Sequence, residues 1–360
     1  MSRCFVSRGL LLLSFIFIIN SAKGQVASLS KPEKTFEEAW FFVYNNYAFL
    51  KEKGINWDKS YSRFRIKVTA KTTDDSLFSF LSQMLTPLND GHVTLRGNNE
   101  RKFSANRPSR LVEEFHTPDL RKKVWTMVDS SLAEAGFGPL QYLGREYNGK
   151  PLFTYTTNGK IGYMRFTRCF WTMWNMNSFV VNSYLNTIMS TFEGMESVIV
   201  DVRFNIGGED RFSFNVAGRF TDKRILALVK QTRIEGMPAF TYPEERYIKP
   251  KGRKPFCGKV VVLTNDRTAS AADVFALAMR QLPNVTIVGE PSEGIFSDMY
   301  STRLPNGWHI SLSNQRYFSP HMISYEGVGV PVDIVAKNSV VDLESNSDPV
   351  LKKALEVLQK

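Results

Sequence analysis

From residue 160 onwards, short apolar runs alternate with stretches of helical periodicity, and this alternation constrains the fold more than any other feature. The runs Ser197-Val-Ile-Val-Asp201 and Val260-Val-Val-Leu263 contain few polar residues. Strands have this pattern when helices cover both faces of the sheet, as is usual for parallel sheets. We therefore expect an α/β core with a mainly parallel sheet. The strands are predicted at 161–166, 197–202, 260–263 and 285–288, and the helices at 179–195 and 271–282.

Residues 35–88 favour helices, so we expect a small helical subdomain before the sheet. Apolar residues recur at helical spacing from Phe36, and Thr35 with Glu38 forms a candidate capping box. Further helices are predicted at 61–68 and from Asp74 towards residue 87, followed by a turn at 89–92 and an extended segment at 92–95. A helical piece is also expected near 118–135, and a hairpin turn at 304–308 between two alternating strands.

The N-terminus has the pattern of a signal peptide. Arg3 and Arg8 precede a ten-residue apolar run at 10–19, and Ala22-Lys23-Gly24 offers small residues at the two positions that a signal peptidase reads. Ten helical residues span about half of a bilayer, and no later segment is apolar enough to cross one. We expect residues 1–24 to be removed and the protein to be exported to the periplasm or the extracellular space. The alternative is a leader that is retained as an anchor.

The charge of the chain restricts its partners. Loss of the leader lowers the formal net charge from +11 to +8, because three basic residues and no acidic residue leave with it. A basic surface favours anionic surroundings such as lipid headgroups or polysaccharide. No run of Lys and Arg is interleaved with aromatic residues, so nucleic acid is not an expected partner. The sequence leaves the oligomeric state open.

Cys169 and Cys257 are the two cysteines beyond the leader, and export permits a disulfide. However, Cys169 follows the strand at 161–166, whereas Cys257 precedes the strand at 259–264. If these strands are parallel, the thiols lie at opposite ends of the sheet, too far apart to bridge. We expect two free, buried thiols. The chain has no CxxC pair and no Cys/His cluster, so we expect neither a zinc site nor a cofactor.

Ser270 is the first candidate for chemistry, in Thr268-Ala-Ser-Ala-Ala-Asp273, between a predicted strand and a predicted helix. Backbone amides at a helix N-terminus are unpaired and positive, so they can stabilise a nucleophile and the oxyanion that it creates. The competing interpretation is structural, because Ser270 with Asp273 also has the spacing of an N-cap and its acidic partner. Capping serines outnumber nucleophiles in any sequence, so the motif alone favours the cap.

Three other features could complete a site. His92 is one of four histidines and follows a predicted turn. Gly207 and Gly208 come directly after a strand, where glycines let backbone amides approach a ligand closely, although they could also form a simple turn. Glu326 lies among glycines and could orient a base or be solvated. The chain lacks the signatures of nucleotide-binding loops.

In their order along the chain, these motifs resemble the carboxyl-terminal processing (tail-specific) peptidases. Within them, the chain is similar to the branch of the tricorn protease core and the interphotoreceptor retinoid-binding protein. The resemblance implies a ClpP/crotonase-like α/β core, a helical N-terminal subdomain and hydrolysis of peptide bonds in proteins or peptides. The matching segments span about 240 residues and are 88–92, 162–165, 201–208, 263–273, 288–290 and 326–330.

Carried over by position, the resemblance makes Ser270 the nucleophile and gives the oxyanion hole to the amides of Ala271 and of Gly207 or Gly208. The better-known branch uses a lysine as base, but Ile295 occupies its place here and cannot accept a proton. The tricorn-like branch uses a histidine and a glutamate that match His92 and Glu326. A neutral imidazole suits this task because its ordinary pKa lies near neutrality.

The chain departs from the family at two places. Gly91 replaces the serine that bridges histidine and glutamate in the tricorn core, so the contact between His92 and Glu326 is direct, through water, or absent. The segment 96–158 is too short for the usual PDZ domain and lacks its carboxylate-binding loop, so selection of substrate tails by a PDZ groove is not expected.

These observations predict a signal peptide at 1–24, a helical subdomain at 25–95, a mixed connecting region at 96–158 and a serine peptidase core at 159–360. Two alternatives to the peptidase stay open. One is a protein that binds an apolar ligand on the same fold, with the aromatic and methionine cluster at 170–174 lining its pocket. The other is a hydrolase of non-peptide cell-envelope material.

Overall fold

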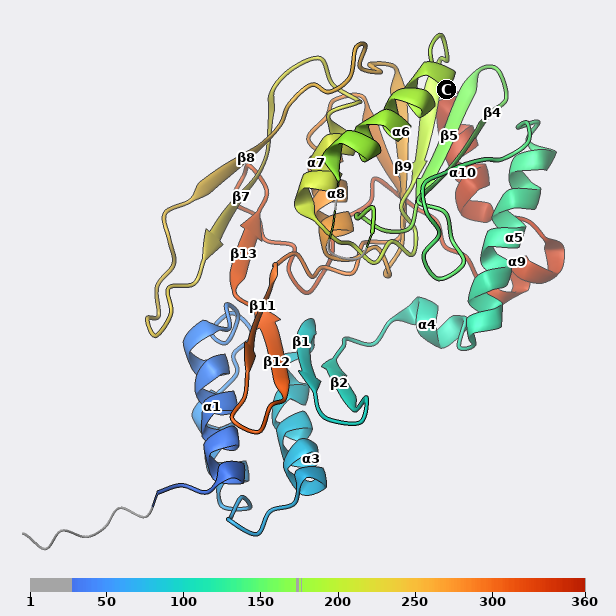
Figure 1. Cartoon of the computed structure of the whole chain (residues 1–360). Coiled ribbons are helices and arrows are strands. Elements are labelled where there is room, and N and C mark those ends of the chain that lie inside the picture. The colour runs from blue at the N-terminus through green and yellow to red at the C-terminus, as the bar shows by residue number, and fades with distance from the viewer. Residues whose placement is uncertain (1–27, 173–174, 176, 360) are drawn as a thin grey trace, which may run out of the picture.

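A seven-stranded sheet forms the centre of the computed structural model, which describes residues 28–172, 175 and 177–359 (Figure 1). The parallel pairs β5–β6, β6–β9, β9–β10 and β10–β14 confirm the predicted mainly parallel sheet, while β3 and β4 add an antiparallel edge. Across the sheet the order is β14 (Ile334–Val335), β10 (Val285–Gly289), β9 (Lys259–Thr264), β6 (Ser197–Asp201), β5 (Ile161–Phe166), β4 (Phe153–Thr157) and β3 (Gln141–Leu143).

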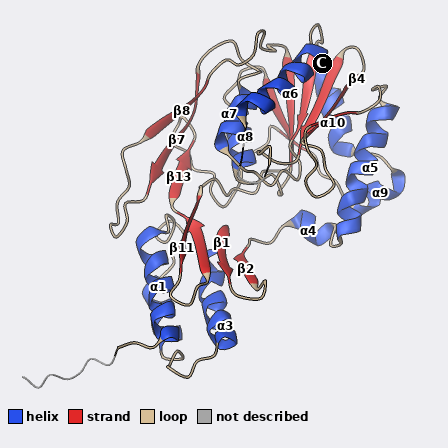
Figure 2. Ribbon diagram, in the orientation of Figure 1, coloured by secondary structure: helices blue, strands red, loops and turns tan. Residues whose placement is uncertain are grey.

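Helices cover both faces of this sheet, as the continuous apolar strands predict (Figures 1 and 2). Along β9, Val260 and Val262 join one core cluster, whereas Val261 and Leu263 join another on the opposite face. The first cluster includes α6 (Ser178–Thr191), α7 (Asp210–Ala217) and α8 (Ala271–Met279); the second includes α4 (Arg110–Glu114), α5 (Pro118–Glu134), α9 (Val340–Ser345) and α10 (Pro349–Leu358).

The N-terminal helices form a second core with strands from both ends of the chain. The predicted late hairpin is present, and its strand β12 pairs with β1 in a four-stranded sheet. Trp308 and Ile310 of the hairpin region share a buried cluster with Phe36 and Leu81 of the helices. The elements are α1 (Lys31–Asn46), α2 (Trp57–Arg65), α3 (Asp74–Leu85), η1 (Thr86–Leu88), β1 (Asp90–Arg96), β2 (Lys102–Ala105), β11 (Met299–Arg303) and β12 (His309–Ser313).

The predicted start of the first helix is wrong. Ser30 is the N-cap and forms the capping box with Glu33, whose carboxylate accepts from the Ser30 amide at 3.0 Å. Thr35 lies inside α1, and its hydroxyl donates to the Lys31 carbonyl. A Ser-x-x-Glu box with proline inside the first turn starts a helix as well as Thr35 with Glu38 would, and it stands earlier in the chain.

A three-stranded sheet connects the two parts of the molecule (Figure 1). It consists of β13 (Gln315–Phe318), β7 (Ile225–Thr232) and β8 (Glu244–Ile248), all antiparallel. The segment between β1 and β5 contains β2, α4, α5, β3 and β4 and no PDZ domain. Across the part of the chain that the structure describes, no helix has the length and apolar character to cross a membrane. The predicted leader lies outside the described residues.

Both cysteines beyond the leader are free, as expected, but only Cys169 is buried. Burial raises the pKa of the Cys169 thiol to about 12, so this side chain stays a neutral thiol. Cys257 is exposed, which corrects the prediction of a buried thiol. It lies on the surface loop that enters the amino end of β9, outside the helical cover of the sheet.

Candidate active site

Ser270 stands at the start of α8, beyond the carboxyl end of β9. Its backbone has φ 58° and ψ −122°, a conformation that costs a residue with a Cβ atom about 1–3 kcal/mol. Nucleophilic serines of other hydrolases stand on sharp, strained turns before a helix. Ser270 is also the helix N-cap, and its amide donates to Asp273 Oδ2 at 2.9 Å. The capping interpretation is therefore confirmed, and the same strained turn suits a nucleophile.

The loop after β6 runs against Ser270. A Cβ atom on Gly207, whose φ is +81°, would lie 2.6 Å from Ser270 Cβ and 2.9 Å from the Ala271 amide nitrogen. Only glycine fits at this distance and in this conformation. The Gly207 amide donates to Asn205 Oδ1 at 2.9 Å, which leaves it unavailable to a ligand. Within the described chain, the amides of Gly208 and Ala271 donate to no protein group.

Asp273 fixes the backbone around Ser270. Its buried carboxylate accepts the Ser270 and Ile295 amides on Oδ2, at 2.9 and 3.1 Å, and the Gly294 amide on Oδ1 at 2.9 Å. Burial raises the pKa of Asp273 to about 7, against the lowering effect of hydrogen bonds from the Ser292 side chain and from the Gly294 and Ile295 amides. The carboxylate thereby ties the first turn of α8 to the segment 292–296.

His92 lies on β1 and is buried, with 6% of its surface exposed. Burial lowers the pKa of the imidazole below its ordinary value, and the charges of Asp90 and Asp298 oppose this only in part. The ring is thus neutral near pH 7, as a general base must be. Its Nδ1 atom is buried and has no hydrogen-bond partner among the described residues.

Glu326 faces the same interior. Its Oε2 accepts the Phe296 amide at 3.1 Å, whereas Oε1 is buried and has no partner in the described part of the chain. Burial, followed by the charge of Asp90, raises the pKa of Glu326 well above its ordinary value. A cationic or hydrogen-bond-donating partner would stabilise the ionised form of such a buried carboxyl group.

The segment 292–296 brings these groups into one neighbourhood. Ile295 donates its amide to Asp273, and its Cδ1 atom lies 3.2 Å from the position of a Cβ on Gly91, next to His92. Ile295 packs at the position where the better-known branch of the peptidases that this chain resembles has its lysine base. A side chain on Gly91 would also lie 3.1 Å from Asn106 Oδ1, so Asn106 would have to shift by a few tenths of an ångström to admit it. Among the described residues, no hydrogen bond joins Ser270, His92 and Glu326 to one another.

Asp90 is the residue that sequence reasoning missed. Its buried carboxylate accepts the His92 amide on Oδ1 at 2.9 Å and the Tyr47 hydroxyl on Oδ2 at 3.0 Å. Lys53 donates to that hydroxyl at 3.0 Å and to the Leu88 carbonyl at 2.8 Å. The sequence shows Asp90 two residues before His92, but Asp-Gly is also typical of a turn, and Tyr47 and Lys53 carry no local signal.

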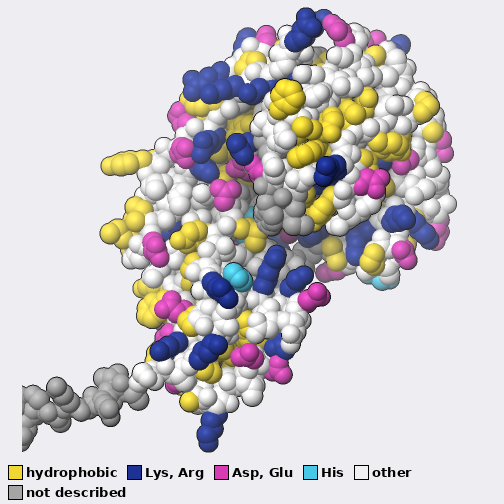
Figure 3. All heavy atoms as spheres, in the orientation of Figure 1, with side chains coloured by type: hydrophobic (Ala, Val, Ile, Leu, Met, Phe, Trp, Pro, Cys, Tyr) yellow, Lys and Arg dark blue, Asp and Glu magenta, His cyan; other side chains and the backbone are white. Residues whose placement is uncertain are grey.

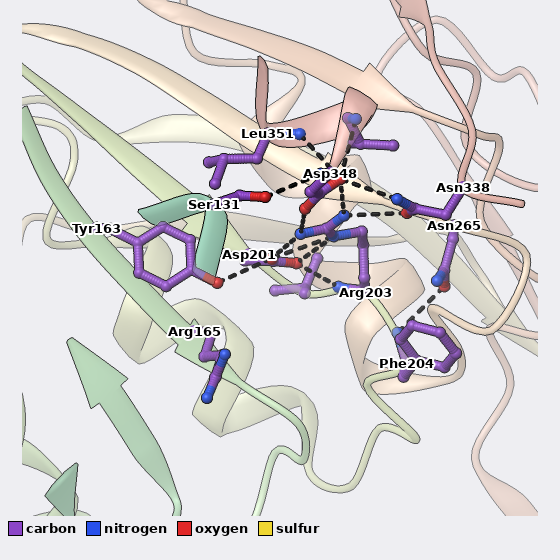
Figure 4. Close-up of polar contacts among 12 residues, drawn as sticks. Ser131, Tyr163, Arg165, Asp201, Arg203, Phe204, Asn265, Asn338, Asp348 and Leu351 are labelled. Atoms are coloured by element: carbon purple, nitrogen blue, oxygen red, sulfur yellow. Dashed lines mark hydrogen bonds and ion pairs between the residues drawn. The ribbon is translucent and has the colours of Figure 1, made fainter. Parts of the chain in front are cut away.

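A buried ion cluster anchors the start of the glycine loop (Figure 4). Arg203 is 1% exposed and pairs with Asp201 at 2.6 Å and with Asp348 at 2.8 Å. Asp348 caps α10 by accepting the Val350 and Leu351 amides, and Tyr163 donates to Asp201. The C-terminal helix therefore holds the residue that directly precedes the turn 204–208.

Two pockets flank the glycine loop, and basic side chains gather around the hollow between the N-terminal part and the core (Figure 3). One pocket, of about 770 Å³, is lined by Gly208, Asp210 and Asp298 with residues of β7 and β8. The other, of about 1000 Å³, is lined by Ile206 and Phe204 with residues of α5 and of the segment 142–151.

The aromatic cluster at 170–174 is described only in part. Trp171 is partly buried and packs against the main core, and Arg145 stacks 5.3 Å from its ring centroid. Phe170 contacts the ring of Tyr147 edge-on. Met173 and Trp174 lie outside the described residues, so the apolar-pocket alternative stays a prediction.

The chain also matches models of known protein families and known relatives. The model for peptidase family S41 matches residues 160–336, and the model for the tricorn protease C1 domain matches residues 30–86. The chain is 24% identical over 204 residues to the tricorn protease of Thermoplasma volcanium, covering 56% of this chain and 18% of that protein. It is 22% identical over 197 residues to a carboxy-terminal-processing protease of Bartonella bacilliformis, covering 55% and 43%. The chain thus spans less than half the length of either relative.

Solved structures share the fold over most of the chain. A candidate peptidase from Parabacteroides merdae superposes with a TM-score of 0.77 at 26% identity, covering 92% of this chain and 98% of that one. The photosystem II D1 C-terminal processing protease superposes with a TM-score of 0.52 at 15% identity, covering 86% and 94%. The second likeness concerns the fold alone.

Proposed function

Because the chain belongs to peptidase family S41, the family of the carboxyl-terminal processing peptidases, we propose that it is a serine peptidase with Ser270 as nucleophile. The observation that carries this proposal is the strained backbone of Ser270, with φ 58°, at the N-terminus of a buried helix and against Gly207. Strain of this kind persists where the surrounding structure enforces it, and it collects at functional sites. Here Asp273 and the glycine loop enforce it.

The oxyanion hole follows from the free amides. Ala271 and Gly208 offer N–H groups without protein acceptors, whereas the Gly207 amide is already bound to Asn205. We assign the oxyanion to the amides of Ala271 and Gly208, with Gly207 making room for Ser270. Donors that are fixed before the reaction stabilise the charge that develops on the carbonyl oxygen.

His92 acts as the general base in this proposal. It takes the Ser270 hydroxyl proton as Oγ bonds to the substrate carbonyl carbon, and it returns that proton to the leaving amine when the C–N bond breaks. Water, activated in the same way, then hydrolyses the acyl-enzyme. The orphaned Nδ1 of His92 and Oε1 of Glu326 are the atoms that hold the ring in position, directly or through one water.

The test is hydrolysis of an unfolded protein such as reduced casein. Ser270→Ala and His92→Ala should abolish cleavage while the circular dichroism spectrum stays that of the wild type. Full activity in either variant would refute its assigned role. Glu326→Gln should retain a small fraction of the activity, because it removes a positioning group and leaves the base in place.

We also propose that the protein acts outside the cytoplasm. The support is the leader pattern at 1–24. The carboxyl-terminal processing relatives come from a bacterium and from a chloroplast. N-terminal sequencing of the protein recovered from the extracytoplasmic fraction should give Gln25 as the first residue. Recovery with Met1 intact in the cytoplasmic fraction would refute this.

A further inference from the structure

The larger pocket lies directly beside the oxyanion loop. It is formed by α5, the segment 142–151 and the ends of β4 and β5, and Ile206 on its wall precedes Gly207 in the chain. Trp125 and Phe204 meet edge-on with ring centroids 5.6 Å apart and give the pocket an apolar base. A side chain or chain end of a peptide bound at Ser270 can therefore enter it.

The lining of this pocket carries an excess of positive charge. Arg121, Lys122, Lys150, Arg165 and Arg267 face two acidic residues, Asp129 and Glu146. Arg165 is paired with Asp129, and Arg267 is paired with Glu293. In the part of the chain that the structure describes, Arg121, Lys122 and Lys150 form no ion pair with a carboxylate.

Lys150 is the cation in this pocket that an anionic ligand would stabilise most. It is partly buried, and burial, followed by the charge of Arg165, lowers the pKa of its ammonium group. Arg121 is also partly buried, and its guanidinium donates to the Phe115 carbonyl rather than to an acid. Buried cations are stabilised by a paired anion, so an incoming carboxylate would relieve this shortage.

The other pocket makes a useful comparison because its charges are more nearly balanced. Five basic residues there face the acidic residues Glu209, Asp210, Glu245 and Asp298. Glu209 pairs with Arg211, and Asp298 pairs with Lys230. Arg224 and Lys249 in this pocket also lack a carboxylate partner among the described residues, but the formal excess here is one positive charge, against three in the pocket beside Ile206. The two sides of the oxyanion loop therefore differ in how strongly they favour an acidic substrate group.

We propose that the pocket between α5 and the segment 142–151 binds a carboxylate of the peptide substrate, held by Lys150 and Arg121. The inference rests on the peptidase function proposed above. The carboxylate can be an Asp or Glu side chain at a fixed distance from the scissile bond, or the C-terminal carboxylate of the substrate.

The experiment uses nonapeptide pools with Glu or Gln at one scanned position, each made with a free and with an amidated C-terminus. Binding is measured on full-length Ser270→Ala protein by competition, and cleavage on the wild type. We expect one Glu position, or the free C-terminus, to improve binding about tenfold, since hydrogen bonds to charged groups are stronger than those between neutral groups. Lys150→Gln and Arg121→Gln should remove this preference, and 0.5 M salt should weaken it.

Lys123→Gln is the matched control, because Lys123 is exposed on α5 and does not line the pocket. It should keep the preference. Equal binding of all pools by the Ser270→Ala protein, or a preference that survives both pocket variants, would overturn the inference. Loss of cleavage without loss of the binding preference would refute the peptidase function and leave the carboxylate pocket standing.

Discussion

Replacing Gly207 with alanine adds one methyl group at the closest approach between the glycine loop and the proposed nucleophile. The new Cβ would lie 2.6 Å from both the Ala269 carbonyl oxygen and Ser270 Cβ. Contacts this short force the backbone to move, at a cost of about 1–3 kcal/mol for overpacking. The positive φ of +81° adds about 1–2 kcal/mol for a residue with a side chain.

Gly194 offers a matched control for this change. Its φ is +82°, and a Cβ on it would meet nothing within 4 Å. Gly194→Ala therefore carries the conformational cost alone, and the difference between the two variants isolates the steric term beside Ser270. Urea unfolding, with both changes placed in the Ser270→Ala background to prevent self-cleavage, should show Gly207→Ala to be less stable by about a further 1–3 kcal/mol.

The catalytic consequence should be larger than the structural one. A displacement of about 1 Å at the reacting atoms can cost about 100-fold in rate. In the otherwise wild-type protein, Gly207→Ala should lower kcat/KM at least that much, whereas Gly194→Ala should leave it unchanged. Equal stability of the two variants together with full activity of Gly207→Ala would refute the close packing of the loop on the nucleophile.

Three further predictions concern ionisable groups in and near the site. The acid limb of the kcat/KM profile should have its midpoint below pH 6.5, the ordinary pKa of histidine, because burial lowers the pKa of His92. At a pH below the pKa of His92 the imidazole is protonated and cannot act as the base. Asp90→Asn should shift the limb further down, since the Asp90 charge raises that pKa; an upward shift would contradict the assignment. Asp348→Asn should lower the free energy of unfolding by about 3 kcal/mol, because it removes one buried partner of Arg203. Urea unfolding would contradict that reasoning if the variant were as stable as the wild type.

The sequence predicts the sheet well because each buried strand carries its own signal. The runs at 161–166 and 260–263 are apolar without interruption, and both lie in the parallel sheet as predicted. The pairing of β1 with β12 could not be predicted, because it joins Thr94 to Ser311 across more than half of the chain. Strands β7 and β8 were not predicted, because neither shows alternating burial: the eight residues of β7 bury only the central three, and β8 buries only its last residue.

The same distinction, between local sequence signals and contacts between distant segments, applies to the site. Motif order points to Ser270, His92 and Glu326, and the structure places their segments around one interior. It does not place hydrogen bonds between them. Asp90 and Asn205 are fixed by contacts from other elements, with Tyr47 and with the Phe166 carbonyl, so no local pattern marks their roles.

The central claim is that Ser270 is an activated nucleophile, and covalent labelling tests it most directly. A fluorophosphonate probe should label the wild-type protein at Ser270, located by mass spectrometry of the peptide that contains it. Labelling should be absent in Ser270→Ala and much slower in His92→Ala, because a serine without its base reacts slowly. An unlabelled Ser270 in folded protein, or equal labelling rates in the wild type and His92→Ala, would contradict the account.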